Sequence, residues 1–183
     1  MAIMKKHAFI QVDFQSSVRL SASEKHKIAN WLKMASGVIE ILIKNHKIIH
    51  SSWLKDTSCI KVSVLLCGEA KIKQLNSEYR NKNKVTDVLS FPSFNSLRRA
   101  KEKGDFTTEE LYLGDLAICH SRTKQQARDF KISYWDEFIH LFMHGIIHLL
   151  GYDHELSQKE EKVMQNFENL SLDMFSKAKK KGP

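Results

Sequence analysis

The segment from His140 to His154, HLFMHGIIHLLGYDH, restricts the possible folds more than any other part of the chain. Most of its residues are apolar, so the segment belongs in a core, but histidine rings recur along it and are costly to bury without partners. Ser133 before it is a suitable N-terminal cap for a helix, and Gly151 is a suitable end. The pattern therefore predicts a buried central helix whose histidines share a partner.

Three of these histidines are spaced to bind one metal ion. His144 and His148 are four residues apart, so a helix brings both onto one face. Gly151 can adopt a left-handed conformation and turn the chain so that His154 returns toward the pair. Three imidazole ligands leave a fourth position free, as in catalytic zinc sites. We therefore expect one Zn²⁺ ion per chain, held by His144, His148 and His154.

His140 lies on the same stripe but is excluded from the ligand set. It is eight residues from His148, or about 12 Å along a helix that rises about 1.5 Å per residue, which is too far for both rings to reach one ion. We expect it beside the ligands, in a cleft or in plain packing. The alternative for the whole group, a set of core histidines, leaves the regular spacing, the glycine and the third ring unexplained.

The rest of the chain alternates strand-like and helix-like segments. Strands are predicted at 8–14, 60–66, 85–91 and 113–119, and helices at 23–45, 70–79, 122–130, 133–151 and 157–175. Gly37 leaves open a division of the first helix into two. The alternation indicates a single α/β domain over residues 1–176, with about four strands in a mixed sheet and helices on both faces in three layers. A basic, frayed tail is expected at 177–183.

Composition restricts the partners and the compartment. The net charge of +8 and the pI of about 9.3 favour an anionic partner such as nucleic acid, or an anionic membrane surface. The basic stretch at 93–110 is interpreted as a solvated loop, with an RNA contact as the alternative. Apolar runs are too short for a signal peptide or a transmembrane helix, and three widely spaced cysteines predict free thiols. We expect a cytoplasmic protein with no membrane partner.

The spacing H-x-x-x-H-x-x-G-x-x-H is also the ligand spacing of the metzincin proteases, so the scaffold is predicted to be zincin-like. Those proteases need a glutamate directly after the first histidine to move protons. Gly145 occupies that position here, and neither Asp153 nor Glu155 has the equivalent place. A zinc metalloprotease is therefore an alternative that the sequence disfavours.

Three blocks of sequence carry a resemblance to a known family. They are HGIIHLLGYDH at 144–154, LNSEYRNKNKVTDVLSFP at 75–92 and, more weakly, LGDLAIC at 113–119. In this order they resemble the YbeY family of bacterial zinc-dependent endoribonucleases, which mature ribosomal RNA. The chain departs from the family pattern at 83–85, where Asn-Lys-Val replaces a more usual lysine-proline, and at 142–143, where Phe-Met fills positions that are normally aliphatic. Neither departure touches a predicted ligand.

The resemblance implies a single-strand-specific, zinc-dependent endoribonuclease that acts in 16S rRNA 3′-end maturation and ribosome quality control. It implies that the three histidines hold zinc and that Arg80 lies in the active cleft. A guanidinium suits a phosphodiester because it offers paired donors to phosphate oxygens. The implied partners are single-stranded or ribosomal RNA and the ribosome or its proteins.

Some roles stay open at this level. The ion can lower the pKa of a water or polarise a phosphoryl oxygen, and the nucleophile is either that water or the 2′-hydroxyl of the RNA. Asp87 and Ser90 are interpreted as ligand-orienting or substrate-contacting residues, or, for Asp87, as a brace for the turn into its strand. Asp115 either supports the metal site or bonds the backbone at a strand end. A non-catalytic ribosome-associated zinc protein is the remaining alternative.

Overall fold

Strands and helices alternate along the chain in the predicted α/β order. The computed structural model describes residues 8–46, 57–94, 109–154 and 156–181. Its elements are β1 (Phe9–Ser16), α1 (Ala22–His46), β2 (Cys59–Cys67), α2 (Glu69–Arg80), β3 (Val88–Pro92), β4 (Glu110–Cys119), α3 (His120–Asp129), α4 (Tyr134–Leu149) and α5 (Gln158–Lys181). Each predicted strand and helix is therefore present.

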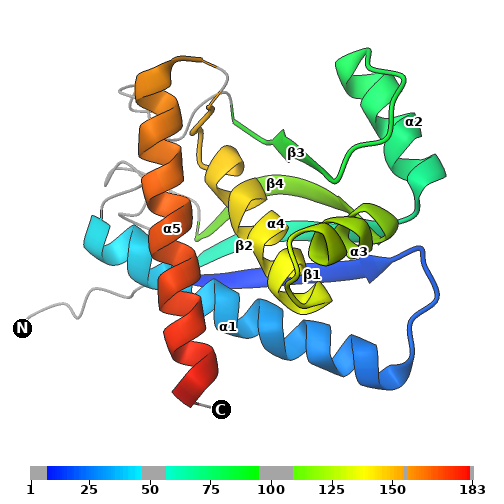
Figure 1. The fold of residues 1–183 in the computed structure, drawn as a ribbon. Coiled ribbons are helices and arrows are strands. Elements are labelled where there is room, and N and C mark those ends of the chain that lie inside the picture. The colour runs from blue at the N-terminus through cyan, green and yellow to red at the C-terminus, as the bar shows by residue number, and fades with distance from the viewer. Residues whose placement is uncertain (1–7, 47–56, 95–108, 155, 182–183) are drawn as a thin grey trace, which may run out of the picture.

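The four strands form one mixed sheet, as the sequence predicts (Figure 1). Their order is β1-β2-β4-β3. β1, β2 and β4 run parallel, and β3 pairs antiparallel with β4 at the edge. Parallel strands need crossover connections, which α1 and α2 supply after β1 and β2.

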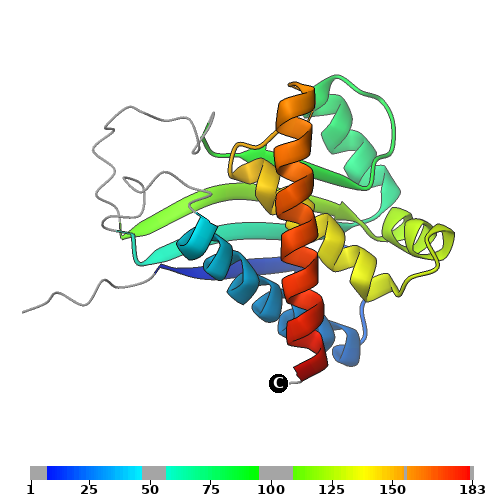
Figure 2. The ribbon, with the colours of Figure 1, turned by 60° about the vertical axis from the view of Figure 1, so that its left-hand side comes forward.

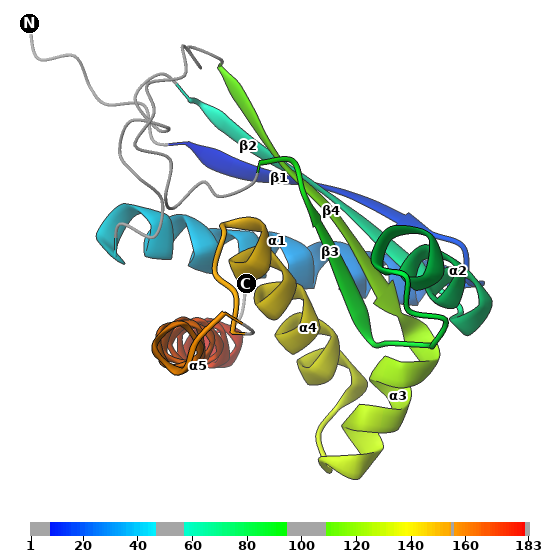
Figure 3. The same ribbon diagram turned by 90° about the horizontal axis from the view of Figure 1, so that it is seen from above.

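The helices are divided unequally between the two faces of the sheet. α1, α4 and α5 cover one face (Figure 3), where the main core contains Ile39, Val64 and Phe142 among many others. On the opposite face α2 packs over one end, where Ile72 joins a smaller cluster with Leu89. Polar side chains occupy the middle of that face. Among the residues that the structure describes, the expected three layers are thus complete only at the end of the sheet where α2 packs.

α5 crosses over α1 and α4 as an outer layer (Figure 2). It continues to Lys181, whereas the sequence predicted an end near Phe175. Its last turns are held to the domain, because the Lys179 ammonium lies 2.8 Å from the Asp136 carboxylate and 4.6 Å from the centre of the Trp31 ring. Residues 182 and 183 of the predicted frayed tail lie outside the described residues.

Two other boundaries refine the predictions. α1 is continuous through Gly37, so the first helix is not divided. β3 begins at Val88 instead of residue 85, because residues 85–87 form the turn that leads into it.

Two further expectations, on the basic stretch and on membrane-spanning helices, can be compared only with the described residues. Residues 95–108 of the basic stretch at 93–110 lie outside the described residues. Among the helices that the structure describes, none is both long enough and apolar enough to span a bilayer.

A bulge in β4 changes which side chains face the core. Lys61 of β2 pairs with Tyr112, but the next residue, Val62, pairs with Gly114, so Leu113 is an extra residue in β4. Gly114 has a φ of 135°, a region that residues with a Cβ rarely adopt. The bulge therefore depends on a glycine at this position.

We predict that Gly114→Ala destabilises the fold by about 2–4 kcal/mol, because backbone strain and a steric clash add together. A Cβ here would lie 2.1 Å from the carbonyl oxygen of Phe91. Urea unfolding monitored by circular dichroism measures the change. Gly37→Ala is the control, because the residue is helical and, among the described residues, no atom apart from its chain neighbours and its own helix backbone lies within 4 Å of its Cβ position. That control should gain about 0.5–1 kcal/mol, and an equal loss in both variants would contradict the account.

Candidate metal centre

The helix that carries the histidines begins and packs as the sequence predicts. Ser133 caps α4, since its hydroxyl accepts a hydrogen bond from the Asp136 backbone N–H at 3.1 Å. Asp136 and Glu137 place negative charge in the first turn, which favours the positive end of the helix dipole. Most of the helix is buried, and the stripe that bears His144 and His148 is the part that remains accessible.

Gly145 lets α4 lie directly on the sheet. A Cβ at this position would be 2.7 Å from one methyl of Leu116 and 3.1 Å from the other. Leu116 is 1% exposed and belongs to β4 in the main core, so it has little space to move. A side chain at residue 145 would therefore have to displace Leu116.

The chain turns back after α4 through a glycine. Gly151 has a φ of 92°, and its N–H bonds the carbonyl of His148 at 2.9 Å while the Tyr152 N–H bonds the carbonyl of Ile147 at 3.2 Å. These two bonds define a Schellman ending, which requires a left-handed residue. Tyr152 is buried and its ring lies 5.0 Å from the Phe167 ring of α5. The turn that leads to the third histidine is therefore anchored on α5.

His144, His148 and His154 come together at the end of α4. One ligand atom from each lies within 4.8 Å of the others, so the group could hold a metal ion. The Nε2 atoms of His144 and His148 are 3.1 Å apart. This is near the roughly 3.3 Å edge of a tetrahedron with zinc–nitrogen bonds of about 2.0–2.1 Å. The two ring nitrogens thus lie at the spacing that a shared ion needs.

A carboxylate that the sequence did not single out holds His144. Glu168 on α5 places Oε1 2.6 Å from the Nδ1 of His144. Burial raises the pKa of Glu168, but the hydrogen bond with His144 and the nearby histidines outweigh it, so this pKa lies below the usual value. Glu168 is 24 residues from His144 along the chain. No local spacing rule could have connected the two residues.

His148 is kept neutral by its surroundings. Burial lowers its pKa to about 4, and the neighbouring His144 and His154 act in the same direction. The charge of Asp153 and a hydrogen bond with the Tyr152 backbone oppose this shift without cancelling it. A neutral imidazole has a free lone pair, which is the form that binds metals.

His140 lies outside the group of three. Its Nδ1 is 3.3 Å from the carboxylate of Glu137, which is buried, and its ring centre is 6.5 Å from that of His144. Because of Glu137, the pKa of His140 is raised in spite of burial. This placement agrees with the prediction that His140 is not a metal ligand.

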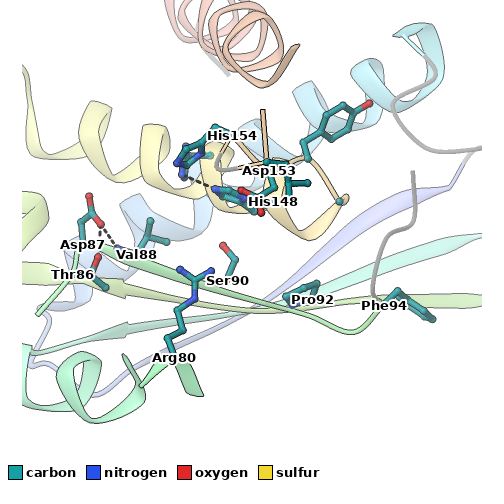
Figure 4. Close-up of a pocket in the computed structure, with 14 residues that line it drawn as sticks. Arg80, Thr86, Asp87, Val88, Ser90, Pro92, Phe94, His148, Asp153 and His154 are labelled. Carbon is teal, nitrogen blue, oxygen red and sulfur yellow. Dashed lines mark hydrogen bonds between the residues drawn. The ribbon is translucent and has the colours of Figure 1, made fainter. Parts of the chain in front are cut away.

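Arg80 and the histidines line one cleft of about 680 Å³ (Figure 4). Arg80 comes from the last turn of α2, and Asn81 ends that helix with a left-handed φ of 55°. The guanidinium of Arg80 points into the cleft on the side opposite His148. Ser90 of β3 also lines the cleft, and its hydroxyl is 3.5 Å from the carbonyl of Gly145.

Asp87 lines the cleft but uses both carboxylate oxygens to brace the chain. Oδ1 accepts bonds from the Thr86 hydroxyl at 3.0 Å and from the Val88 N–H at 2.8 Å. Oδ2 accepts a bond from the Gln126 amide of α3 at 2.8 Å. The sequence left three roles open for Asp87: orienting a ligand, contacting substrate and bracing the turn. These hydrogen bonds support the last of them.

Asp115 does not support the metal site. It lies on the face of the sheet away from α4, where the Tyr112 hydroxyl donates to its Oδ1 at 2.7 Å. It also shares a cross-strand row with Ser63 and Phe91. The side chain is bonded to a tyrosine, so both readings offered by the sequence are wrong.

The sequence of this chain matches a known family over most of its length. A family model described as "Endoribonuclease YbeY" matches residues 19–176. The chain belongs to the YbeY family. The match includes Arg80, the three clustered histidines and Glu168, so the whole cleft lies within the matched region.

Individual relatives agree with this assignment, and a solved structure shares the fold. A protein named endoribonuclease YbeY from Leptospira interrogans is 37% identical over 138 residues, which cover 72% of this chain and 97% of the relative. One of the same name from Aquifex aeolicus is 40% identical over 119 residues, covering 65% and 73%. The solution structure of TM1509 from Thermotoga maritima is 22% identical, with a TM-score of 0.53 and 94% of each chain covered. That last similarity supports the fold alone.

We predict that Gly151→Ala loses about 1–2 kcal/mol of unfolding free energy, the cost of a left-handed residue with a Cβ. It should also weaken metal binding, because the turn positions His154. Urea unfolding in the presence of a chelator gives the first quantity, and metal titration gives the second. Gly151→Asn is the matched variant, since asparagine tolerates this region. If the Ala variant matched the wild type in both measurements, the turn would not set the site.

Proposed function

We propose that this protein is a single-strand-specific, zinc-dependent endoribonuclease that acts in 16S rRNA 3′-end maturation and ribosome quality control. Membership of the YbeY family supports the reaction class. The observation that carries the proposal is the shared cleft, in which Arg80 lies across from the clustered histidines. A guanidinium that can contact phosphate and a histidine group that could hold a metal ion therefore line the same cleft.

The donor set fits zinc, with His144, His148 and His154 as the proposed ligands. Glu168 accepts from Nδ1 of His144, and the Nε2 of that ring faces the Nε2 of His148 at 3.1 Å. With Nδ1 protonated, the Nε2 of His144 presents a bare lone pair to its neighbour, an arrangement that a cation between the rings would stabilise. Three nitrogen ligands are typical of catalytic zinc. When bound, zinc supplies a Lewis acid for phosphodiester cleavage.

Arg80 is the residue that we propose acts on the substrate. Its guanidinium can donate two parallel hydrogen bonds to phosphate oxygens and stabilise negative charge as it develops. The side chain is exposed at the cleft wall, so it reaches a ligand without rearrangement of the core. Arg80 thus binds and orients the scissile phosphate.

The walls of the cleft favour an unpaired strand. Pro92, Phe94 and Leu156 line it beside the charged groups, and Leu156 is 57% exposed. Unstacked bases can contact such apolar surfaces, whereas bases in a duplex are already stacked. The net charge of +8 would attract the RNA backbone, with affinity that falls as salt rises. The ribosome and its proteins are the proposed context.

A protease is disfavoured by the packing of α4. Gly145 stands where a metzincin has its catalytic glutamate, and any side chain at this position would have to displace the buried Leu116. We expect the zinc-loaded protein to leave unfolded casein intact, as seen by gel electrophoresis over hours. Casein fragments that disappear in the His148→Ala variant would argue for a protease instead.

We predict about one zinc per chain by metal analysis and cleavage of a single-stranded RNA by the same preparation. Arg80→Ala should keep the zinc and lose roughly 100- to 1000-fold in cleavage rate, the loss typical of removing one donor to the transition state. Rates from end-labelled RNA, compared with a duplex of the same sequence, measure both activity and strand preference.

Lys82→Ala is the matched control for this test. Lys82 is an exposed cation two residues away, and it does not line the cleft. Its loss should change the rate only a few-fold, through general electrostatics. Equal losses of cleavage rate in Arg80→Ala and Lys82→Ala would show that Arg80 is not a catalytic residue. Cleavage that persists after zinc is removed would indicate a contaminating nuclease.

A further inference from the structure

Glu168 reaches the histidine cluster from a different helix. Its Oε1 lies 2.6 Å from the Nδ1 of His144. Both side chains are largely shielded from water, with 17% of the Glu168 side chain and 23% of the His144 side chain exposed. A short, shielded bond of this kind fixes the orientation of a ring.

The bond also determines which nitrogen of His144 can bind a metal. Glu168 meets His144 through a carboxylate oxygen, Oε1, which accepts hydrogen bonds. The Nδ1 of His144 must then carry the proton. Its Nε2, which faces His148, is left with the free lone pair. The carboxylate thereby selects the metal-binding tautomer of His144.

The neighbouring residue on α5 holds the other side of the cluster. The Phe167 ring packs on Tyr152, in the turn that leads from α4 to His154. One turn of α5 therefore contacts both the helix with the first two histidines and the loop with the third. The Ser171 hydroxyl bonds the Glu168 carbonyl at 2.8 Å, which adds a local constraint to this turn.

We propose that Glu168 is a positioning residue for the metal centre and that it couples metal binding to the docking of α5. This inference rests on the metal site of the proposed function. The carboxylate does not need to touch the substrate, because it acts through His144. Since coupling is reciprocal, an ion that prefers the oriented ring also stabilises α5 against the domain.

Metal affinity tests the proposal without any RNA. Apoprotein prepared with a chelator is titrated with zinc in the presence of a competing indicator. We expect Glu168→Ala to raise the zinc Kd roughly 10- to 100-fold, the usual cost of losing a carboxylate behind a histidine ligand. Glu168→Gln should lose less, because its amide oxygen still accepts from Nδ1 without a charge. If Glu168→Ala does not fold, the zinc Kd of Glu168→Gln alone tests the proposal.

Glu161→Gln is the matched control. It removes the same charge from the same helix at an exposed position, so its zinc Kd should stay within about two-fold of the wild type, since exposed charges interact weakly. Equal Kd values for Glu168→Gln, Glu168→Ala and the control would overturn the proposal. A drop in the stability of the apoprotein with no change in Kd would also overturn it, because that is the signature of a purely structural residue.

Hydrogen exchange tests the coupling to α5. Zinc should slow amide exchange around Phe167 and Glu168 in the wild type and in Glu161→Gln, and this slowing should be lost in Glu168→Ala. Equal slowing in all three proteins would show that α5 docks independently of the metal. Loss of RNA cleavage with normal zinc affinity would instead count against the proposed function, so the two failures are distinguishable.

Discussion

The site depends on how closely α4 approaches the sheet. Gly145 permits this approach, because Leu116 of β4 fills the space where a Cβ would be. The contact fixes the position of α4 on the core face, with His144 directly beside the glycine and His148 one turn further along the accessible stripe. Because protein cores are close-packed, a shift of the helix away from the sheet would move both rings together.

The site also requires the chain to turn back after α4, so that His154 approaches His144 and His148. Gly151 ends the helix in a left-handed conformation, and Tyr152 then anchors the turn on α5. The cleft is completed by Arg80, which comes from a helix on the other face of the sheet. The site therefore combines a local motif with two contacts that only the tertiary fold can supply.

The local part of this arrangement could be predicted from the sequence. Histidines four residues apart, a helix-ending glycine and a nearby third histidine have fixed geometric consequences, and the structure places them together. Arg80 could not be placed by spacing, and only the family resemblance indicated its position. Glu168 was missed because it lies 24 residues from its partner on an amphipathic helix with several other acidic residues. Asp115 was misjudged because a sequence does not state which face of a strand meets which helix.

The bulge in β4 acts as a change of phase in the strand. Before it, Leu111 and Leu113 face the main core, and after it Leu116 and Ile118 do so. The residues that face the main core thus have odd numbers before the bulge and even numbers after it. If residues 113 and 114 instead continued the regular alternation of the strand, Leu116 would face away from α4. The place of this irregularity in β4 is consequently as restrictive as the chemistry of the side chains around it.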